Sequence, residues 1–328
     1  MSIVHPQPDG RFEGRLSGVL SPVLTPFEAD GSPSQPRFIE HCRTLLNHDV
    51  GLAVFGTNSE ATSLSLREKR GLLDALLQAG MPPERMLPGV GACAMEDASE
   101  LAQHAVSAGC AGVLMLPPFY YKSVSEEGLF RAFANVIDRV ADTRLRIYLY
   151  HIPPVTQVGI SLVLIERLLR AFPGQVAGVK DSSGDWNNTA AMLREFSAEG
   201  FAVFAGSETN LVDTMRHGGA GVISATANVN PAGIANLCAQ WQQPDAAARQ
   251  AALNQLRACF AQFPMIAAMK AAMAAGLQDL HWNRLRPPLV ELDPIERESL
   301  LRQLDALEFQ LYRGQCATAE QRPDLALI

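Results

Sequence analysis

Residues 176–184 read Val-Ala-Gly-Val-Lys-Asp-Ser-Ser-Gly, a short apolar run that ends in a lysine and is followed by a turn. The run has the length and composition of a buried strand, yet it puts the amine of Lys180 at the strand end. A lysine can lose its proton whereas an arginine cannot, and burial favours the neutral amine that attacks a carbonyl. Lys180 is therefore a candidate imine-forming nucleophile. A surface lysine just past a strand is the alternative that this segment alone leaves open.

Short apolar runs of the same kind recur along the chain, with helix-like stretches between them. Together with the run that ends at Lys180, they cover residues 19–24, 51–55, 85–89, 112–116, 146–150, 176–180, 201–205 and 221–224. Strands that alternate with helices predict a parallel sheet. Eight such units favour an α/β fold of the (β/α)8 TIM barrel class, although a doubly wound sheet gives the same alternation.

The helical stretches include one clear start signal and one change of pattern. Ser65-Leu66-Arg67-Glu68 has the form of a capping box, which predicts that a helix begins there. After the last strand, residues 235–277 and 295–312 are predicted as helices, and Arg286-Pro287-Pro288-Leu289 interrupts them because proline cannot continue a helix. The predicted organisation is an N-terminal tail (1–14), a catalytic barrel (15–235), a C-terminal helical region (236–314) and a second tail (315–328).

Composition excludes several classes of partner. The formal net charge is -7 and the arginines are scattered, so no basic stripe is present to bind nucleic acid. Six cysteines without a C-x-x-C pair indicate reduced thiols and a cytoplasmic protein. The polar N-terminus has no apolar core of a secretory signal, and no uncharged apolar run is long enough to predict a membrane span.

No cofactor is predicted. The seven histidines show neither H-x-H nor H-E-x-x-H spacing, so a metal-dependent barrel enzyme, such as a class II aldolase, is not favoured. Gly89-Val90-Gly91 does not continue into a dinucleotide-binding motif, and no G-K-[ST] occurs.

Polar and aromatic residues follow five of the predicted strands, where a barrel places its catalytic groups. These segments are Gly56-Thr57-Asn58-Ser59-Glu60, Pro117-Pro118-Phe119-Tyr120-Tyr121, Tyr150-His151-Ile152-Pro153-Pro154, Lys180-Asp181-Ser182-Ser183-Gly184 and Gly206-Ser207-Glu208. The constellation predicts a site for a small carbonyl acid. Substrate contacts are predicted from Thr57, Asn58, Gly206, Glu208 and Ile223.

Imine chemistry gives the catalytic groups separate tasks. A proton must reach the oxygen that leaves the carbinolamine, and another must later leave the methyl carbon. Tyr150 ends the strand beside Lys180 and is predicted as the general acid and base, although its phenol needs a polar partner to be competent. Thr57 is the predicted relay, and the backbone N–H groups of Thr57 and Asn58 are predicted to hold the substrate carboxylate.

These residues in this order resemble the dihydrodipicolinate synthase / N-acetylneuraminate lyase superfamily, the pyruvate-dependent class I aldolases on (β/α)8 barrels. The resemblance runs from about Gly18 to the segment at 286–289. It implies that the loop at 56–60 binds the keto-acid carboxylate, that Tyr150 belongs to a Y-x-x-P motif, and that Lys180 forms the Schiff base. It also implies that Tyr120 completes a proton relay across a dimer contact, and hence a homodimer or homotetramer.

Three departures from the family pattern bear on the substrate. Val155 stands where dihydrodipicolinate synthases have an arginine that holds the carboxylate of aspartate semialdehyde, and a valine cannot make that contact. Ser59 replaces the loop glycine and Asn58 the second loop hydroxyl, which resembles 4-hydroxy-2-oxoglutarate aldolases. Glu208 lies where sialic acid lyases bind acceptor hydroxyls, and a solvated loop glutamate is the alternative.

The sequence thus predicts a metal-independent class I lyase or aldolase that forms an imine between Lys180 and pyruvate or a related 2-oxo acid. Three alternatives stay open: a 4-hydroxy-tetrahydrodipicolinate synthase that uses aspartate semialdehyde, a 2-keto-3-deoxy acid dehydratase, and a non-catalytic sensor of 2-oxo acids.

Overall fold

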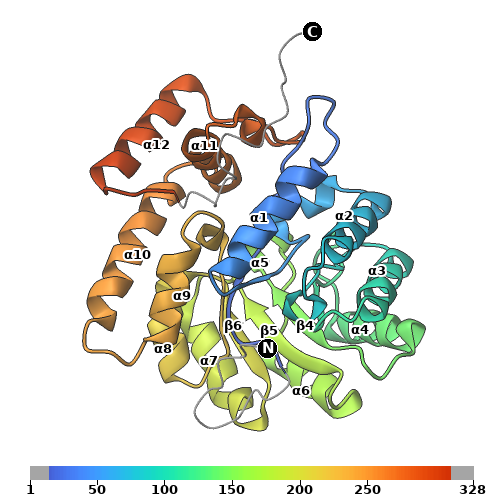
Figure 1. Ribbon diagram of the computed structural model, residues 1–328. Coiled ribbons are helices and arrows are strands. Elements are labelled where there is room, and N and C mark those ends of the chain that lie inside the picture. The colour runs from blue at the N-terminus through green and yellow to red at the C-terminus, as the bar shows by residue number, and fades with distance from the viewer. Residues whose placement is uncertain (1–14, 312–328) are drawn as a thin grey trace.

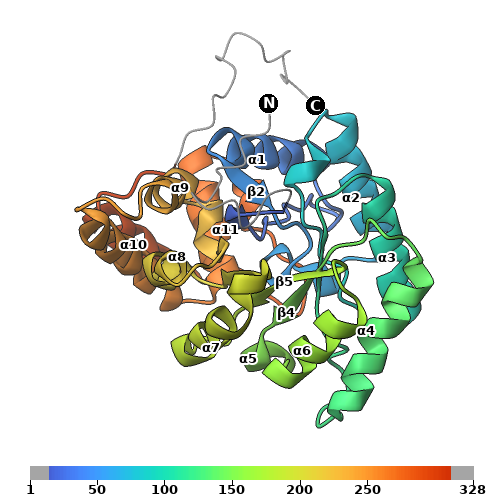
Figure 2. The same cartoon turned by 90° about the horizontal axis from the view of Figure 1, so that it is seen from below.

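The computed structural model describes residues 15–311. A ring of parallel strands lies at the centre, and helices surround it (Figures 1 and 2). The predicted tails 1–14 and 315–328 lie outside the described residues. Within residues 15–311 the strands are β1 (Gly18–Ser21), β2 (Val50–Leu52), β3 (Val113–Met115), β4 (Ile147–His151), β5 (Val176–Asp181), β6 (Ala202–Ala205) and β7 (Gly221–Ile223). They form one sheet in the order β2-β1-β7-β6-β5-β4-β3, and every neighbouring pair is parallel.

Residues 86–89 fill the eighth position of the ring, between β2 and β3. Isolated parallel bridges join this segment to Leu52 of β2 and to Leu114 of β3. The N–H of Leu87 donates to the Leu52 carbonyl (2.8 Å), and the N–H of Leu114 donates to the Pro88 carbonyl (2.9 Å). The predicted strand at 85–89 is therefore wrong as a regular strand, because Pro88 has no N–H to give to a ladder. Its bridges nevertheless close the ring, and the predicted TIM barrel is confirmed.

The helices follow the strands in the predicted alternation. They are α1 (Gln35–Asn47), α2 (Leu66–Gln78), α3 (Met95–Ser107), α4 (Glu126–Val140), α5 (Pro153–Thr156), α6 (Leu162–Ala171), α7 (Trp186–Phe196), α8 (Leu211–Arg216), α9 (Pro231–Ala239), α10 (Ala246–Ala261), α11 (Met265–Leu277) and α12 (Pro294–Ala306). The predicted capping box begins α2. The Ser65 hydroxyl accepts the N–H of Glu68 (3.3 Å), and the Glu68 carboxylate accepts the N–H of Ser65 (2.8 Å).

Of the C-terminal helices, α10 lies beside the barrel next to α8 and α9, and α11 and α12 pack together above it (Figure 1). The predicted helix 295–312 ends early, at Ala306, because Glu308 adopts a left-handed φ of 52°. The predicted boundary at residue 235 falls inside α9, so the helical region is better begun after that helix. Within residues 15–311 no single helix is long and apolar enough to span a membrane, and α10 with α11 meets that test only as a pair bent by 105°.

Side chains from the strands fill the barrel interior, while their neighbours along each strand face the helices. The interior cluster comprises Leu20, Ala53, Leu87, Leu114, Tyr148, Tyr150, Ile152, Ala177, Ala202, Phe204, Ala220 and Ile223. A larger cluster lies between the strands and the surrounding helices, and a third joins the C-terminal helices. The interior cluster contains the predicted acid and base, Tyr150, which places the site at the centre of the ring.

Candidate active site

Lys180 lies at the end of β5 and is only 2% exposed, so the surface-lysine alternative is wrong. Its Cα pairs with Tyr150 on β4 and with Phe204 on β6. The amine therefore stands among interior side chains of the barrel, in the surroundings that a nucleophilic lysine requires.

A bulge in β5 sets which way Lys180 faces. The pairing of β4 with β5 skips Ala177 between Ile147 and Tyr148, so one extra residue shifts the alternation of the strand. Gly178 sits at this shift because a Cβ there would come within 2.7 Å of the Tyr148 ring. Beyond the bulge, the inward-facing residues of β4 and β5 are opposite each other. Lys180 therefore lies beside Tyr150.

Three functional groups form a hydrogen-bonded chain at this end of the barrel. The Lys180 Nζ donates to the Tyr150 Oη at 3.2 Å, and the Tyr150 Oη is 3.1 Å from the Thr57 Oγ1. The same Nζ lies 4.3 Å from the centre of the Tyr150 ring. Protons can therefore pass between the amine and the threonine hydroxyl through a single phenol.

The loop after β2 is a 3₁₀ turn, η1 (Thr57–Ser59), that presents backbone N–H groups. Ser59 explains why the loop tolerates the loss of the family glycine: its hydroxyl accepts the N–H of Gly56 at 3.1 Å and so closes the turn. Within residues 15–311, the N–H groups of Thr57 and Asn58 have no acceptor. Asn58 itself is half-buried in the turn.

Glu60 anchors this loop, a role that the sequence reasoning missed. Its carboxylate pairs with the Lys270 ammonium of α11 and accepts the N–H of Arg286 at 2.9 Å. The Lys270 ammonium also donates to the Arg284 carbonyl at 2.7 Å. Burial lowers the pKa of Lys270 to about 8, an effect that Glu60 opposes. The sequence did hold a signal for a buried charge, because Lys270 is the one charged residue of the apolar helix Met265–Leu277, but it did not indicate the partner.

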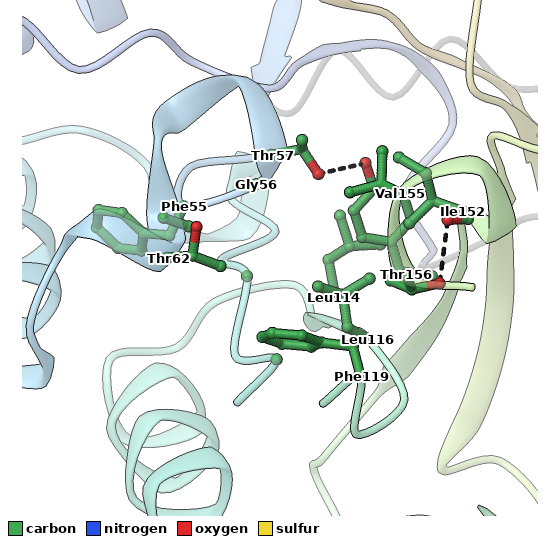
Figure 3. A pocket seen from close by; sticks show the side chains of 14 residues that line it. Phe55, Gly56, Thr57, Thr62, Leu114, Leu116, Phe119, Ile152, Val155 and Thr156 are labelled. Atoms are coloured by element: carbon green, nitrogen blue, oxygen red, sulfur yellow. Dashed lines mark hydrogen bonds between the residues drawn. The ribbon is translucent and has the colours of Figure 1, made fainter. Parts of the chain in front are cut away.

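A cavity of about 100 Å³ opens beside the Tyr150 and Thr57 hydroxyls (Figure 3). Its walls come from the loop after β2, the bridging segment, β3, β4 and the loops that follow them. The lining residues are Phe55, Gly56, Thr57, Ala61, Thr62, Gly89, Gly91, Leu114, Leu116, Phe119, Tyr150, Ile152, Val155 and Thr156. Lys180 is not among them, so its amine meets the cavity through the Tyr150 hydroxyl.

Tyr120 is not brought to this chain's own site. Its side chain is 74% exposed and packs edge-on against Tyr121, with ring centres 5.3 Å apart. The predicted dimer role of Tyr120 thus stays a prediction.

Gly206 and Ile223 lie on the far side of the barrel from the cavity. Ile223 is fully buried and belongs to the same interior cluster as Tyr150 and Phe204. Gly206 donates its N–H to the Asp181 carbonyl at 2.7 Å, and a Cβ at this position would lie 2.1 Å from the Ser182 hydroxyl. Gly206 thus lets the loops after β5 and β6 approach each other.

Glu208 is only 1% exposed, so the alternative that it is a solvated loop carboxylate is wrong. Its two oxygens accept hydrogen bonds from the hydroxyls of Ser224 and Thr226, and Arg257 of α10 lies 3.5 Å away. The side chain therefore braces β7 and α10, and the structure does not bring it to the cavity. Contact between Glu208 and a substrate stays a prediction that would require these bonds to be exchanged.

No group of three or more His, Cys, Asp or Glu side chains is arranged to hold a metal ion within residues 15–311.

Comparison with known proteins agrees with this geometry. Residues 15–307 match the model of the dihydrodipicolinate synthetase family. An uncharacterized DapA-like lyase of Chloroflexus aurantiacus is 32% identical over 84% of this chain and 92% of its own length.

Two solved structures superpose closely on the chain. The dihydrodipicolinate synthase of Agrobacterium tumefaciens has a TM-score of 0.82 and 34% identity, with 88% of this chain and 99% of that one covered. YagE, a prophage protein of E. coli K12 solved in complex with pyruvate, has a TM-score of 0.81 and 27% identity, with 89% and 99% covered. The resemblance inferred from the loop at 56–60, Tyr150 and Lys180 is thereby confirmed, and the chain belongs to the dihydrodipicolinate synthetase family.

Proposed function

We propose that this protein forms an imine between Lys180 and pyruvate or a closely related 2-oxo acid, and then makes or breaks a carbon–carbon bond at C3 of that acid. The chain is a lyase or aldolase of its family, and the observation that supports this chemistry is the buried chain from Lys180 through Tyr150 to Thr57. A structural relative was solved in complex with pyruvate, which supports the same donor.

The groups act in a definite order. The neutral Lys180 amine adds to the C2 carbonyl, and Tyr150 gives a proton to the hydroxyl of the carbinolamine, which leaves as water. Tyr150 then removes a proton from C3 and so generates an enamine, while Thr57 exchanges protons with the phenol. The free N–H groups of Thr57 and Asn58 bind the carboxylate and hold C2 near the amine.

Lysine biosynthesis is the second reading, since several relatives are named 4-hydroxy-tetrahydrodipicolinate synthase. Val155 lies on the cavity wall where that reaction calls for a cation, so we place this activity second. Dehydration of a 3-deoxy-2-oxo acid begins with the same imine and proton removal, and stays open. A non-catalytic sensor is disfavoured by the intact relay.

We further propose that the working form is a homodimer or homotetramer in the cytoplasm, without a metal or organic cofactor. The exposed phenol of Tyr120 supports the assembly, because an aromatic pair left in solvent is the kind of group that a neighbouring subunit covers.

Borohydride trapping tests the proposed function. Incubation with pyruvate and borohydride should add the mass of the reduced adduct to the peptide that contains Lys180, and Lys180→Ala should remain unmodified. A wild-type protein left unmodified, under conditions that label a known class I aldolase, would overturn the proposal.

A further inference from the structure

The cavity beside the Tyr150 and Thr57 hydroxyls carries no charged side chain on its walls, although a 2-oxo acid aldolase must accept polar reactants. Its hydroxyls are unevenly placed. Those of Thr57 and Tyr150 are hydrogen-bonded to each other, and the Tyr150 hydroxyl also contacts the Lys180 amine. The hydroxyl of Thr156 donates to the Ile152 carbonyl at 3.0 Å and so serves the backbone of α5.

Thr62 adds a further hydroxyl to the lining, and the remaining side chains of the wall are hydrocarbon. Leu114, Leu116 and Phe119 of β3 and its loop face the cavity together with Ile152 and Val155 (Figure 3). An anionic substituent placed against these side chains would lose part of its hydration without gaining a cationic partner, whereas an apolar one would gain burial.

Lys122 lies at the edge of this wall, and its ammonium is already engaged. Its ammonium donates to the carbonyl of Phe119 and to that of Thr156, the latter at 2.7 Å. It therefore links the loop after β3 to α5 across one edge of the cavity.

We propose that the aldehyde fragment handled beside the imine carries an apolar substituent, branched aliphatic or aromatic, and that Val155 helps to select it. The inference rests on the imine chemistry of Lys180 proposed above. In the direction of synthesis, C3 of the enamine bonds to the aldehyde carbon, the aldehyde oxygen takes a proton, and water releases a 4-hydroxy-2-oxo acid from the lysine. In cleavage, the 4-hydroxyl loses its proton, the C3–C4 bond breaks, and its electron pair returns to the iminium as the enamine.

Two substrates that differ only at C4 test the inference: 4-hydroxy-4-phenyl-2-oxobutanoate and 4-hydroxy-2-oxoglutarate. Pyruvate release from each is measured as kcat/KM. We expect the phenyl compound to be favoured by at least about tenfold, because the carboxylate of its competitor would be desolvated without a partner. Exchange of the pyruvate methyl hydrogens in D2O is measured in parallel, since it reports imine formation without any aldehyde.

A matched pair of variants identifies the wall responsible. Val155→Arg puts a cation at the cavity and should move the ratio toward 4-hydroxy-2-oxoglutarate by at least about tenfold. Val163→Arg makes the same change at an equally exposed valine, 61% against 60%, on α6 outside the cavity, and should leave the ratio as in the wild type.

The outcomes separate the two proposals. Exchange together with a preference for the phenyl compound that Val155→Arg reverses supports the inference. Exchange together with equal use of both compounds, or a preference for 4-hydroxy-2-oxoglutarate, overturns the inference and leaves the imine chemistry intact. If neither hydrogen exchange nor borohydride trapping is observed, the proposed function is overturned, and the inference falls with it.

Discussion

The Lys270 ammonium and the Glu60 carboxylate form an ion pair in which both side chains are completely buried. Glu60 has a left-handed φ of 55° and directly follows the turn that carries Thr57. Lys270 belongs to α11, so the pair connects the C-terminal helices to the loop that presents N–H groups to the substrate. A buried pair of this kind fixes one arrangement, because any other leaves a charge uncompensated.

Removing one member should therefore be costly. Lys270→Met leaves the Glu60 carboxylate buried without its partner, and we expect a loss of about 3–5 kcal/mol in the free energy of unfolding, measured by denaturant titration. Any folded fraction should show a raised KM for pyruvate, since the loop of Thr57 is no longer held.

Two comparisons sharpen this prediction. Adding Glu60→Gln to Lys270→Met should recover part of the stability, because the stranded charge is then gone. Arg70→Met breaks a pair with Glu100 whose side chains are 46% and 45% exposed, and it should cost no more than about 1 kcal/mol. Equal losses for the buried and the exposed pair would contradict the argument.

Tyr150→Phe should lower kcat by about 10²–10⁴, because the phenol is the only link between the amine and Thr57 in the hydrogen-bonded chain. Tyr148→Phe is the matched control on the same strand and the same face. The Tyr148 hydroxyl accepts the N–H of Leu16 at 3.3 Å, and burial raises its pKa to about 12. Steady-state assays should show near wild-type kcat for Tyr148→Phe, and a comparable loss in both variants would count against a catalytic role for Tyr150.

Gly206→Ala should destabilise the protein by about 1–3 kcal/mol, since the new Cβ would come within 2.1 Å of the Ser182 hydroxyl and 2.7 Å of the Asp181 carbonyl. The strained loop directly follows Lys180, so kcat should fall as well. Gly71→Ala, in α2 with no atom within 4 Å, should instead stabilise by about 0.5–1 kcal/mol. Thermal unfolding of the two variants should thus shift in opposite directions.

His41 should make the fold sensitive to acid. It is buried, its Nε2 lies 2.9 Å from the Asn228 Oδ1, and burial lowers its pKa from 6.5 to about 4. Between those two pH values the unfolded chain binds a proton that the folded chain does not, so the free energy of unfolding falls as the pH falls. The loss over this window should total about 3 kcal/mol.

Denaturant titrations between pH 4 and pH 7 would measure this slope. His41→Gln should be less stable at neutral pH and show a flatter dependence, whereas His217→Gln, at an exposed position, should keep the slope of the wild type. A slope unchanged in His41→Gln would assign the acid sensitivity to other groups.

Tyr120 should act in a neighbouring subunit's site. If so, Tyr120→Phe and Lys180→Ala, each impaired alone, should regain activity when mixed under conditions that exchange subunits, because a hybrid dimer holds one site with both groups intact. Activity assays before and after exchange measure the gain. Activity of the mixture no higher than the mean of its parents would remove Tyr120 from the relay.

The sequence predicted the barrel well because each apolar run is bounded by turn residues and followed by a helical stretch. Its errors were local. Residues 85–89 read as a strand by composition, yet Pro88 and two isolated bridges leave them without a regular ladder. The run at 51–55 also ends early, since Phe55 turns to a left-handed φ of 62°. Apolar composition does not record where the backbone leaves the sheet.

The proximity of Lys180, Tyr150 and Thr57 was predictable because strand ends of a parallel barrel converge on one rim. The ion pair of Lys270 with Glu60 was not, since the two residues are 210 positions apart and only tertiary packing brings them together. The burial of Glu208 was missed for the same reason, because its partners Ser224, Thr226 and Arg257 are not adjacent to it in sequence.

The uneven ring has a consequence for how this enzyme can diversify. The β4–β5 ladder, which positions the nucleophile, is continuous over the four residue pairs that follow its bulge, whereas the seam at 86–89 is held by single bridges and borders the cavity. Amide hydrogens at the seam should exchange with solvent sooner than those of the ladder. Lys180 and Tyr150 thus lie on the regular ladder, whereas the cavity borders the irregular seam, so substitutions beside the seam should alter the proposed choice of second reactant with little effect on the position of the nucleophile.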